Sequence, residues 1–255
     1  MRQEIKDYKF YERRIQTVDL VLQQSHKRMS DGFIPSERFA TFYDSKRSNK
    51  LTKTILKYTF GEPIEEVKRE FKNVIKYANE NWVGLWILKL SANKFLKQYT
   101  LSGYDEMLSM LSLSYLLDID ELDFRKLVDL IDQDGIKDYL FEFIIRAKIK
   151  DRKPIFEESY QDYFGVPKVF KKLREAILEI DKTKSEKLVK EFIRQEWYRN
   201  HKGQGWYDCH KSIHDVYYGY WSFETAAVVK IMRLDDSTFL DCQYYPKDLV
   251  HQENN

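Results

Sequence analysis

The stretch that decides the fold is residues 136–149, IKDYLFEFIIRAKI. Its apolar side chains fall on nearly all sides of a helix, which is typical of a helix buried inside a protein. The segment before it, Leu122 to Ile131, also has helical periodicity, with Asp120 placed as an N-cap and Gly135 placed after its end. We therefore expect a core of helices packed around residues 136–149.

Helical spacing of apolar residues extends over most of the chain. After Pro63, five apolar residues share one helix face, which predicts a helix there. Residues 85–96 and 107–117 are predicted as apolar helices, and a last long helix is predicted from about Ile213 to Met232. No stretch alternates apolar and polar residues for long enough to predict a strand. The predicted fold class is all-α, a compact multi-helix bundle of roughly nine to eleven helices in two helical subdomains packed together. We expect an N-terminal domain over residues 1–135 and a C-terminal domain over residues 136–255.

Composition excludes several classes of protein. The chain has 255 residues, and its longest nearly apolar stretch, Val83 to Leu90, already contains Lys89. A membrane-spanning helix needs about 20 apolar residues, so no membrane partner is expected. Residues 1–14 are charged throughout and lack the apolar region of a secretory signal. The only cysteines, Cys209 and Cys242, suit a reducing compartment, and we expect the protein to be cytoplasmic.

Charge is distributed unevenly along the sequence. The whole chain carries 43 Lys and Arg against 41 Asp and Glu, but residues 105–145 hold 3 basic and 11 acidic residues. We predict that the acids of this block bind a basic protein partner, since a negative surface steers and holds a cationic protein. The alternative is a solvated face that balances a basic remainder. The candidate partner-binding residues are Asp118, Asp120, Glu121, Asp123, Asp129, Asp132, Asp134 and Asp138.

A basic stripe gives a second candidate surface. Lys46, Lys50, Lys53 and Lys57 are spaced four, three and four residues apart, so they share one side of a predicted helix. Such a stripe can follow nucleic-acid phosphates, although it can equally be the solvated face of a surface helix.

Motifs for catalysis are incomplete. His210 and His214 have the spacing of a zinc-binding pair on a helix, but the glutamate base of a metalloprotease is missing between them and no third ligand follows. Gly203-Gln204-Gly205 lacks the third glycine of a dinucleotide loop, and no phosphate-binding loop or nucleophile elbow occurs. We therefore predict no catalytic residue, no metal and no cofactor. A metal-dependent hydrolase built on the two histidines remains an alternative.

Three C-terminal segments stand out by their composition. Residues 217–230 read YYGYWSFETAAVVK, residues 234–237 read LDDS, and residues 244–249 read YYPKDL. In this order and spacing they resemble the C-terminal signature of the PoNi family, the immunity proteins of the polymorphic DNA-nuclease toxins called PoNe. Thr225 stands where the family usually has alanine. The matching residues that we expect to be structural are Gly219, Tyr220, Trp221, Phe223, Glu224, Asp235, Asp236, Tyr244, Tyr245, Pro246 and Asp248.

The resemblance implies an all-α protein without enzymatic activity that binds a cognate secreted nuclease in the cytosol. It implies a protein partner and no direct contact with nucleic acid. Because immunity proteins diversify where they touch their own toxin, we expect the shared signature to support the fold and the interface to lie elsewhere. The alternative function is a helical nucleic-acid-binding or regulatory protein that uses the lysine stripe.

Overall fold

The computed structural model describes residues 1–91, 94–160 and 166–251 and is 63% helical. The all-α fold class is confirmed. By compactness the chain forms two units, which are described separately: Met1–Leu85 with Asp208–Gly219 (unit 1), and Trp86–Tyr207 with Tyr220–Asn255 (unit 2). The division of the sequence at residue 135 stays a prediction.

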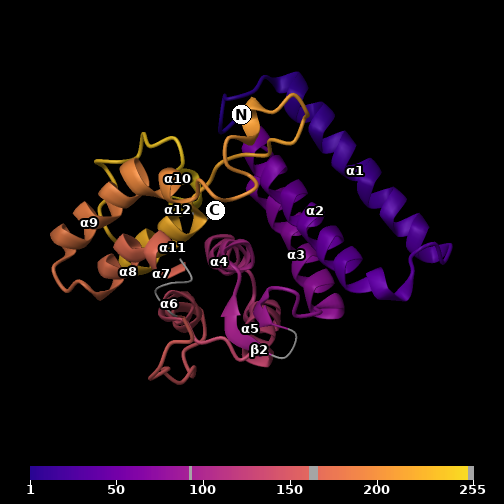
Figure 1. Cartoon of the computed structure of the whole chain (residues 1–255). Coiled ribbons are helices and arrows are strands. Elements are labelled where there is room, and N and C mark those ends of the chain that lie inside the picture. Colours follow the sequence, from indigo (N-terminus) through magenta and orange to yellow (C-terminus); the bar gives the residue numbers. More distant parts are fainter. Residues whose placement is uncertain (92–93, 161–165, 252–255) are drawn as a thin grey trace. The chain divides into compact units, whose positions relative to one another are not determined.

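Unit 1 is built on three long helices, drawn in indigo and purple in Figure 1. They are α1 (Tyr8–Ser30), α2 (Phe39–Phe60) and α3 (Ile64–Asn81), with the short helix η1 (Ser36–Arg38) between the first two. Helix α2 packs against both α1 and α3. Gly61 ends α2 with φ 102°, a conformation that side-chain-bearing residues rarely adopt. The predicted apolar face of α3 is confirmed, because Val67, Phe71, Val74, Ile75 and Ala78 are all buried.

Residues 208–219 return from the C-terminal part of the sequence and join unit 1. The predicted helix from Ile213 to Met232 is therefore wrong over its first half. Its second half is helical as α11 (Phe223–Met232), which belongs to unit 2, and the short helix η4 (Cys209–Lys211) ends before the predicted range begins. Gly219 has φ 120°, which interrupts a helix. The Tyr217 hydroxyl donates to Oε1 of Gln3 at 2.6 Å, so this segment is held by contacts distant in sequence.

Unit 2 opens with a hairpin where a helix was predicted. Strands β1 (Ile87–Ser91) and β2 (Lys94–Tyr99) pair antiparallel, so the helix predicted over residues 85–96 is wrong in the described part of that range. Residues 92–93 lie outside the described residues. The cause is tertiary, because two distant residues fix Tyr99. The Tyr99 N–H donates to the Tyr160 hydroxyl at 2.9 Å, and the Tyr99 hydroxyl donates to Asp134 at 2.7 Å. Trp86 also packs on Gly103, where a Cβ would lie 2.5 Å from the indole.

The core of unit 2 lies where α4 (Leu101–Leu116), α6 (Tyr139–Lys148) and α11 pack on one another. In α6 the side chains of Leu140, Phe141, Ile144 and Ile145 are at most 1% exposed. The prediction of a central helix within residues 136–149 is thus confirmed. Helix α5 (Glu121–Gln133) precedes α6 and begins at the predicted cap, Asp120.

Shorter elements complete unit 2. They are α7 (Val166–Val169), α8 (Lys171–Leu178), α9 (Lys182–Glu191), the π-helical turn η3 (Phe192–Glu196), α10 (Trp197–Asn200) and α12 (Lys247–Val250). Helix α8 packs against α9, α6 and α11. In the part of the chain that the structure describes, no helix has both the length and the apolar character that a bilayer span requires.

Candidate functional site

The predicted acidic block falls on α5 and on the segments that flank it. Two of its acids hold local structure. Oδ1 of Asp120 accepts the Asp123 N–H at 3.0 Å, which caps the N-terminus of α5. Asp134, at the other end of the helix, accepts the Tyr99 hydroxyl at 2.7 Å. Both carboxylates therefore already have partners within unit 2.

Asp138 is the most deeply placed acid of the block, with a fully buried side chain. It caps α6 by accepting the N–H groups of Leu140 and Phe141 at 2.9 Å, and it pairs with Arg174 at 2.8 Å. The Tyr104 hydroxyl donates to it at 3.0 Å. A side chain without exposed surface cannot touch a partner protein, so we leave Asp138 out of the proposed contact surface.

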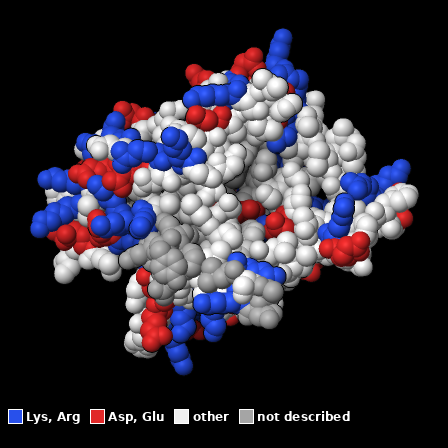
Figure 2. Space-filling model, in the orientation of Figure 1, with Lys and Arg blue, Asp and Glu red and all other residues white. Residues whose placement is uncertain are grey.

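Most of the other acids form ion pairs with lysine and arginine residues. The pairs are Lys148 with Asp118 (2.5 Å), Arg125 with Glu121 (2.7 Å), Lys126 with Asp123 (2.6 Å) and Arg152 with Asp132 (2.6 Å). Two of these basic residues, Lys148 and Arg152, lie after residue 145, in the basic stretch that follows the block. The mutual repulsion expected among the acids is thus largely relieved within unit 2. Figure 2 shows the same interspersion of acidic and basic side chains on the face that it draws.

Asp129 differs from the rest of the block. It is exposed on α5, and no hydrogen bond or ion pair of its side chain occurs among residues 1–91, 94–160 and 166–251. The last turn of α5 contains no basic residue, and the C-terminal end of a helix carries negative partial charge. Asp129 is therefore a carboxylate that the protein itself does not neutralise.

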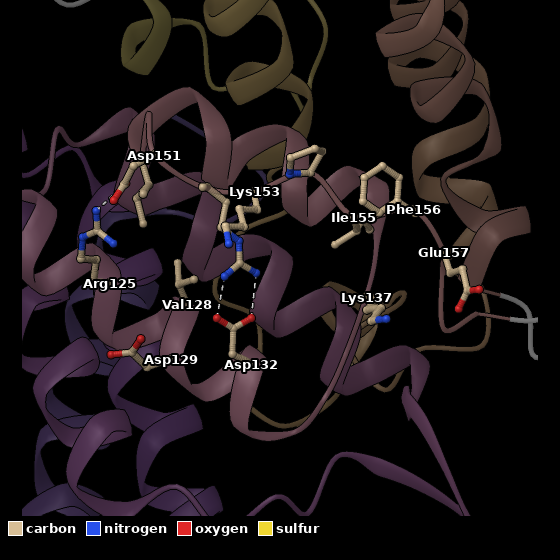
Figure 3. A pocket seen from close by; sticks show the side chains of 13 residues that line it. Arg125, Val128, Asp129, Asp132, Lys137, Asp151, Lys153, Ile155, Phe156 and Glu157 are labelled. Atoms are coloured by element: carbon tan, nitrogen blue, oxygen red, sulfur yellow. Dashed lines mark hydrogen bonds and ion pairs between the residues drawn. The ribbon is translucent and has the colours of Figure 1, made fainter.

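A cavity of about 720 Å³ lies beside Asp129 (Figure 3). One wall is α5, through Arg125, Val128, Asp129 and Asp132. The other is the non-helical segment from Ile149 to Glu157, which includes Arg152 and Phe156. Sequence analysis did not single out this segment. Its signal is the apolar pair Ile155-Phe156 set among charged residues directly after Lys153-Pro154.

Two ion pairs cross the cavity and join its walls. Arg152 makes a two-pronged contact with Asp132 at 2.6 and 2.7 Å and also contacts Glu142 at 2.6 Å. Arg125 reaches Asp151 at 2.8 Å, and its guanidinium lowers the pKa of that carboxyl. Hydrogen bonds to Asp132 and then Glu142 raise the pKa of Arg152 above its usual range. The segment 149–157 is thereby fixed against α5.

From Tyr220 onward the family-like signature lies in a different setting, inside unit 2. Tyr220, Trp221, Phe223 and Glu224 are 1–8% exposed. Oε1 of Glu224 accepts hydrogen bonds from the Trp197 indole and from the Ser222 hydroxyl, both at 2.6 Å. An unpaired buried carboxylate is costly, and these two donors meet that requirement.

The later signature residues hold the C-terminal tail. Asp236 accepts the Tyr245 hydroxyl at 2.7 Å and lies 2.8 Å from Nε2 of His251. The Ser222 N–H donates to the Tyr244 carbonyl at 2.8 Å, which ties the tail to the start of α11. Asp235 caps the next turn, Pro246 is buried, and Asp248 lies in the first turn of α12. All these contacts are internal to unit 2.

Glu224 belongs to a cluster of buried titratable side chains that was not predicted from the sequence. Burial, followed by the charge of Asp105, raises the pKa of Glu224 to about 7. Burial alone would lower the pKa of His201, but Asp105 at 3.3 Å and the Trp197 carbonyl at 2.6 Å raise it above the ordinary value. The Trp206 indole donates to Asp105 at 3.1 Å. This network lies among stacked aromatic rings and is a feature of the core.

The lysine stripe lies on α2 in unit 1, and its members are only partly exposed. Lys53 pairs with Asp19 at 2.8 Å and with Glu70 at 3.2 Å, and Lys57 pairs with Glu70 at 3.3 Å. Lys46 and Lys50 both lie over the ring of Tyr77, at 5.4 and 5.5 Å. Half of the stripe is thus occupied by acids of α1 and α3, which weakens the case for a phosphate-binding surface.

The histidine pair does not share a helix face. His210 lies in η4, whereas His214 is exposed in the non-helical segment that follows. Within the described ranges, no group of three or more His, Cys, Asp or Glu side chains is placed to hold a metal ion. Cys209 and Cys242 are not joined in a disulfide.

Comparison with known proteins gives the family. The profile described as PoNe immunity protein (PoNi), N-terminal, matches residues 5–129, and the profile described as PoNe immunity proteins (PoNi), C-terminal, matches residues 136–249. Among solved structures, the chain is similar to protein PA2201 from Pseudomonas aeruginosa, with a TM-score of 0.67 and 16% identity over 98% of this chain and 89% of that one. That likeness shows a shared fold. No curated protein matches the sequence.

The two profiles cover nearly the whole chain, so the protein belongs to the family of PoNe immunity proteins. The resemblance inferred from residues 219–249 is therefore confirmed. It is an immunity protein for a PoNe nuclease toxin.

Proposed function

We propose that the protein protects the cell that makes it by binding a cognate PoNe-type DNA nuclease in the cytosol and blocking its activity. The observation that carries this proposal is family membership over residues 5–129 and 136–249. The absence of complete catalytic motifs in the sequence agrees with an inhibitor that acts by binding.

The exposed acids on and beside α5 are the proposed contact surface. A DNA nuclease must attract phosphates and needs a positive potential at its substrate groove, and an inhibitor can use the same field. Asp118, Glu121, Asp129 and Asp132 remain exposed and are retained from the predicted block. Asp120 is exposed and Asp123 and Asp134 are half-buried, and all three also have a capping or pairing role.

The proposal is tested with a cognate PoNe-type nuclease, to be sought first among the genes next to this one. Producing the nuclease domain in a susceptible bacterial host should stop growth, and producing this protein with it should restore growth. In vitro, DNA cleavage should fall in proportion to added protein and reach zero near one protein per toxin. Inhibition far below that ratio would indicate catalytic inactivation instead, and no protection with no complex would refute the proposed function.

DNA binding by this protein alone tests the alternative function. A gel-shift experiment with duplex DNA at low salt should show no complex, because the stripe on α2 is partly neutralised by Asp19 and Glu70. A salt-dependent shift that Lys46→Ala and Lys50→Ala remove would favour the nucleic-acid alternative.

A further inference from the structure

The ion-pair networks at the cavity beside α5 contain more acidic than basic groups. Each of its two arginines is shared by two carboxylates: Arg152 by Asp132 and Glu142, and Arg125 by Glu121 and Asp151. Asp129 and Glu157 add two more carboxylates, and Lys137 and Lys153 add two ammonium groups. The lining itself holds four acids and four basic groups and is neutral in sum. Glu121 and Glu142, which share the two arginines from outside the lining, bring the charge of these networks to −2.

Two side chains of the cavity, Asp129 and Phe156, can each bind a cationic group. Asp129 is an exposed carboxylate without an ion pair inside the described chain, and in Figure 3 no dashed contact reaches it. Phe156 is 88% exposed on the opposite wall, and an aromatic ring attracts ammonium and guanidinium groups over its face. A lysine or arginine side chain satisfies either group.

The shape of the cavity favours a protein surface over a small molecule. Small-molecule sites enclose most of their ligand in apolar walls. Here the walls are charged, two ion pairs cross the space, and the side chains of Phe156 and Asp151 are 88% and 79% exposed. Aromatic residues surrounded by a polar rim are characteristic of protein interfaces, and the ion pairs hold this surface in place before binding.

We propose that this cavity is the docking site of the cognate nuclease, which places a basic surface loop in it with one Lys or Arg side chain on Asp129 and another side chain over Phe156. The proposal rests on the proposed function and adds the position of the interface and the chemistry of the partner's loop. It narrows the eight acids of the sequence prediction to one unpaired carboxylate and adds an aromatic residue outside that block.

The test measures the affinity of full-length variants for the catalytically inactivated domain of the cognate nuclease, by calorimetry and by binding kinetics. The variants are Asp129→Lys, Asp129→Asn and Phe156→Ser. The matched controls are Glu37→Lys, the same charge reversal at an exposed acid of η1, and Ile180→Ser, an exposed apolar residue at 96% exposure in unit 2. Melting temperatures of all variants are measured alongside, because every changed side chain is exposed.

We expect Asp129→Lys and Phe156→Ser each to weaken binding roughly tenfold or more, and Asp129→Asn to slow association mainly at low salt. Both controls should bind within about twofold of wild type, and all melting temperatures should stay unchanged. If the wild type binds the nuclease while Asp129→Lys and Phe156→Ser bind equally well, the docking site is wrong and the proposed function stands. If the wild type binds no nuclease, both proposals fail.

Discussion

The signature around α11 and the cavity beside α5 lie in the same unit and differ in almost every physical respect. Signature residues such as Trp221 and Glu224 are buried, and their hydrogen bonds end on other residues of unit 2. Asp129 and Phe156 are exposed, the first without an ion pair in the described chain and the second without cover. The difference teaches that the residues most useful for recognising the family are poorly placed to recognise a toxin.

The largest expected effect tests the buried side of this comparison. Truncating a buried large aromatic residue costs about 3–5 kcal/mol, so Trp221→Ala should lower the free energy of unfolding by that amount. Urea unfolding followed by circular dichroism measures it, with Ile180→Ala as an exposed control. Toxin affinity of the folded fraction should be unchanged. A normal melting temperature combined with lost toxin binding would move the signature to the interface.

Variants of Asp138 test whether this acid of the block supports the fold and does not contact a partner. Asp138→Ala removes an α6 cap and the buried partner of Arg174, which keeps only its ion pair with Glu158. Breaking a buried pair costs about 3–5 kcal/mol when the remaining charge has no other partner, so we expect a loss of stability below that range. Asp138→Asn keeps a capping side chain and should lose less stability. Thermal unfolding of both variants provides the measurement. Wild-type stability in Asp138→Ala would show that the network around Tyr104 does not support the fold.

Glu224 gives the buried network a pH dependence. Its pKa is raised from 4.5 to about 7, mainly by burial, so the folded protein holds this proton more tightly than the unfolded chain. The stabilisation is complete below pH 4.5 and is lost as the pH rises to about 7, and this group contributes about 3 kcal/mol. The raised pKa of His201 extends the loss above pH 6.5.

Glu224→Gln should therefore flatten the stability profile between pH 4.5 and 7. It should reduce the His201 contribution only slightly, because Asp105 and the Trp197 carbonyl raise the pKa of His201 more than the charge of Glu224 does. Urea unfolding at five pH values measures the difference, and Glu175→Gln, an exposed acid on α8, serves as control. Parallel profiles for wild type and Glu224→Gln would mean that Glu224 does not hold a proton in the folded state.

The smallest effect is expected on the exposed side. Glu121→Gln removes a solvent-exposed ion pair with Arg125, and such pairs add little to stability. The melting temperature should stay at the wild-type value, and association with the inactive nuclease should slow modestly at low salt and not at high salt. A marked loss of stability would show that exposed acids near the cavity also support the fold, as the buried signature residues do.

Sequence reasoning was most reliable where contacts are local. The apolar face of α3 and the Asp120 cap follow from residues within one or two turns of each other, and both are present. The hairpin of β1 and β2 was missed because Tyr99 is fixed by Asp134 and Tyr160, which lie 35 and 61 residues further along the chain. Local pattern carries no information about such partners.

The candidate site shows the same limit. The excess of acids in residues 105–145 can be counted from the sequence, but the ion pairs that neutralise them cannot be predicted from it. Lys148 lies 30 residues from its partner Asp118, and Arg152 lies 20 residues from its partner Asp132. Once those pairs are known, Asp129 is the acid left over. Its significance is a property of the fold and not of its sequence neighbours.

One measurement compares the two regions directly: hydrogen exchange of the full-length protein with and without the inactivated nuclease domain. The account predicts that the toxin slows amide exchange in residues 121–133 and 149–157, around the cavity, and leaves residues 220–249 unchanged. Protection confined to residues 220–249, with the cavity segments exchanging as in the free protein, would contradict it.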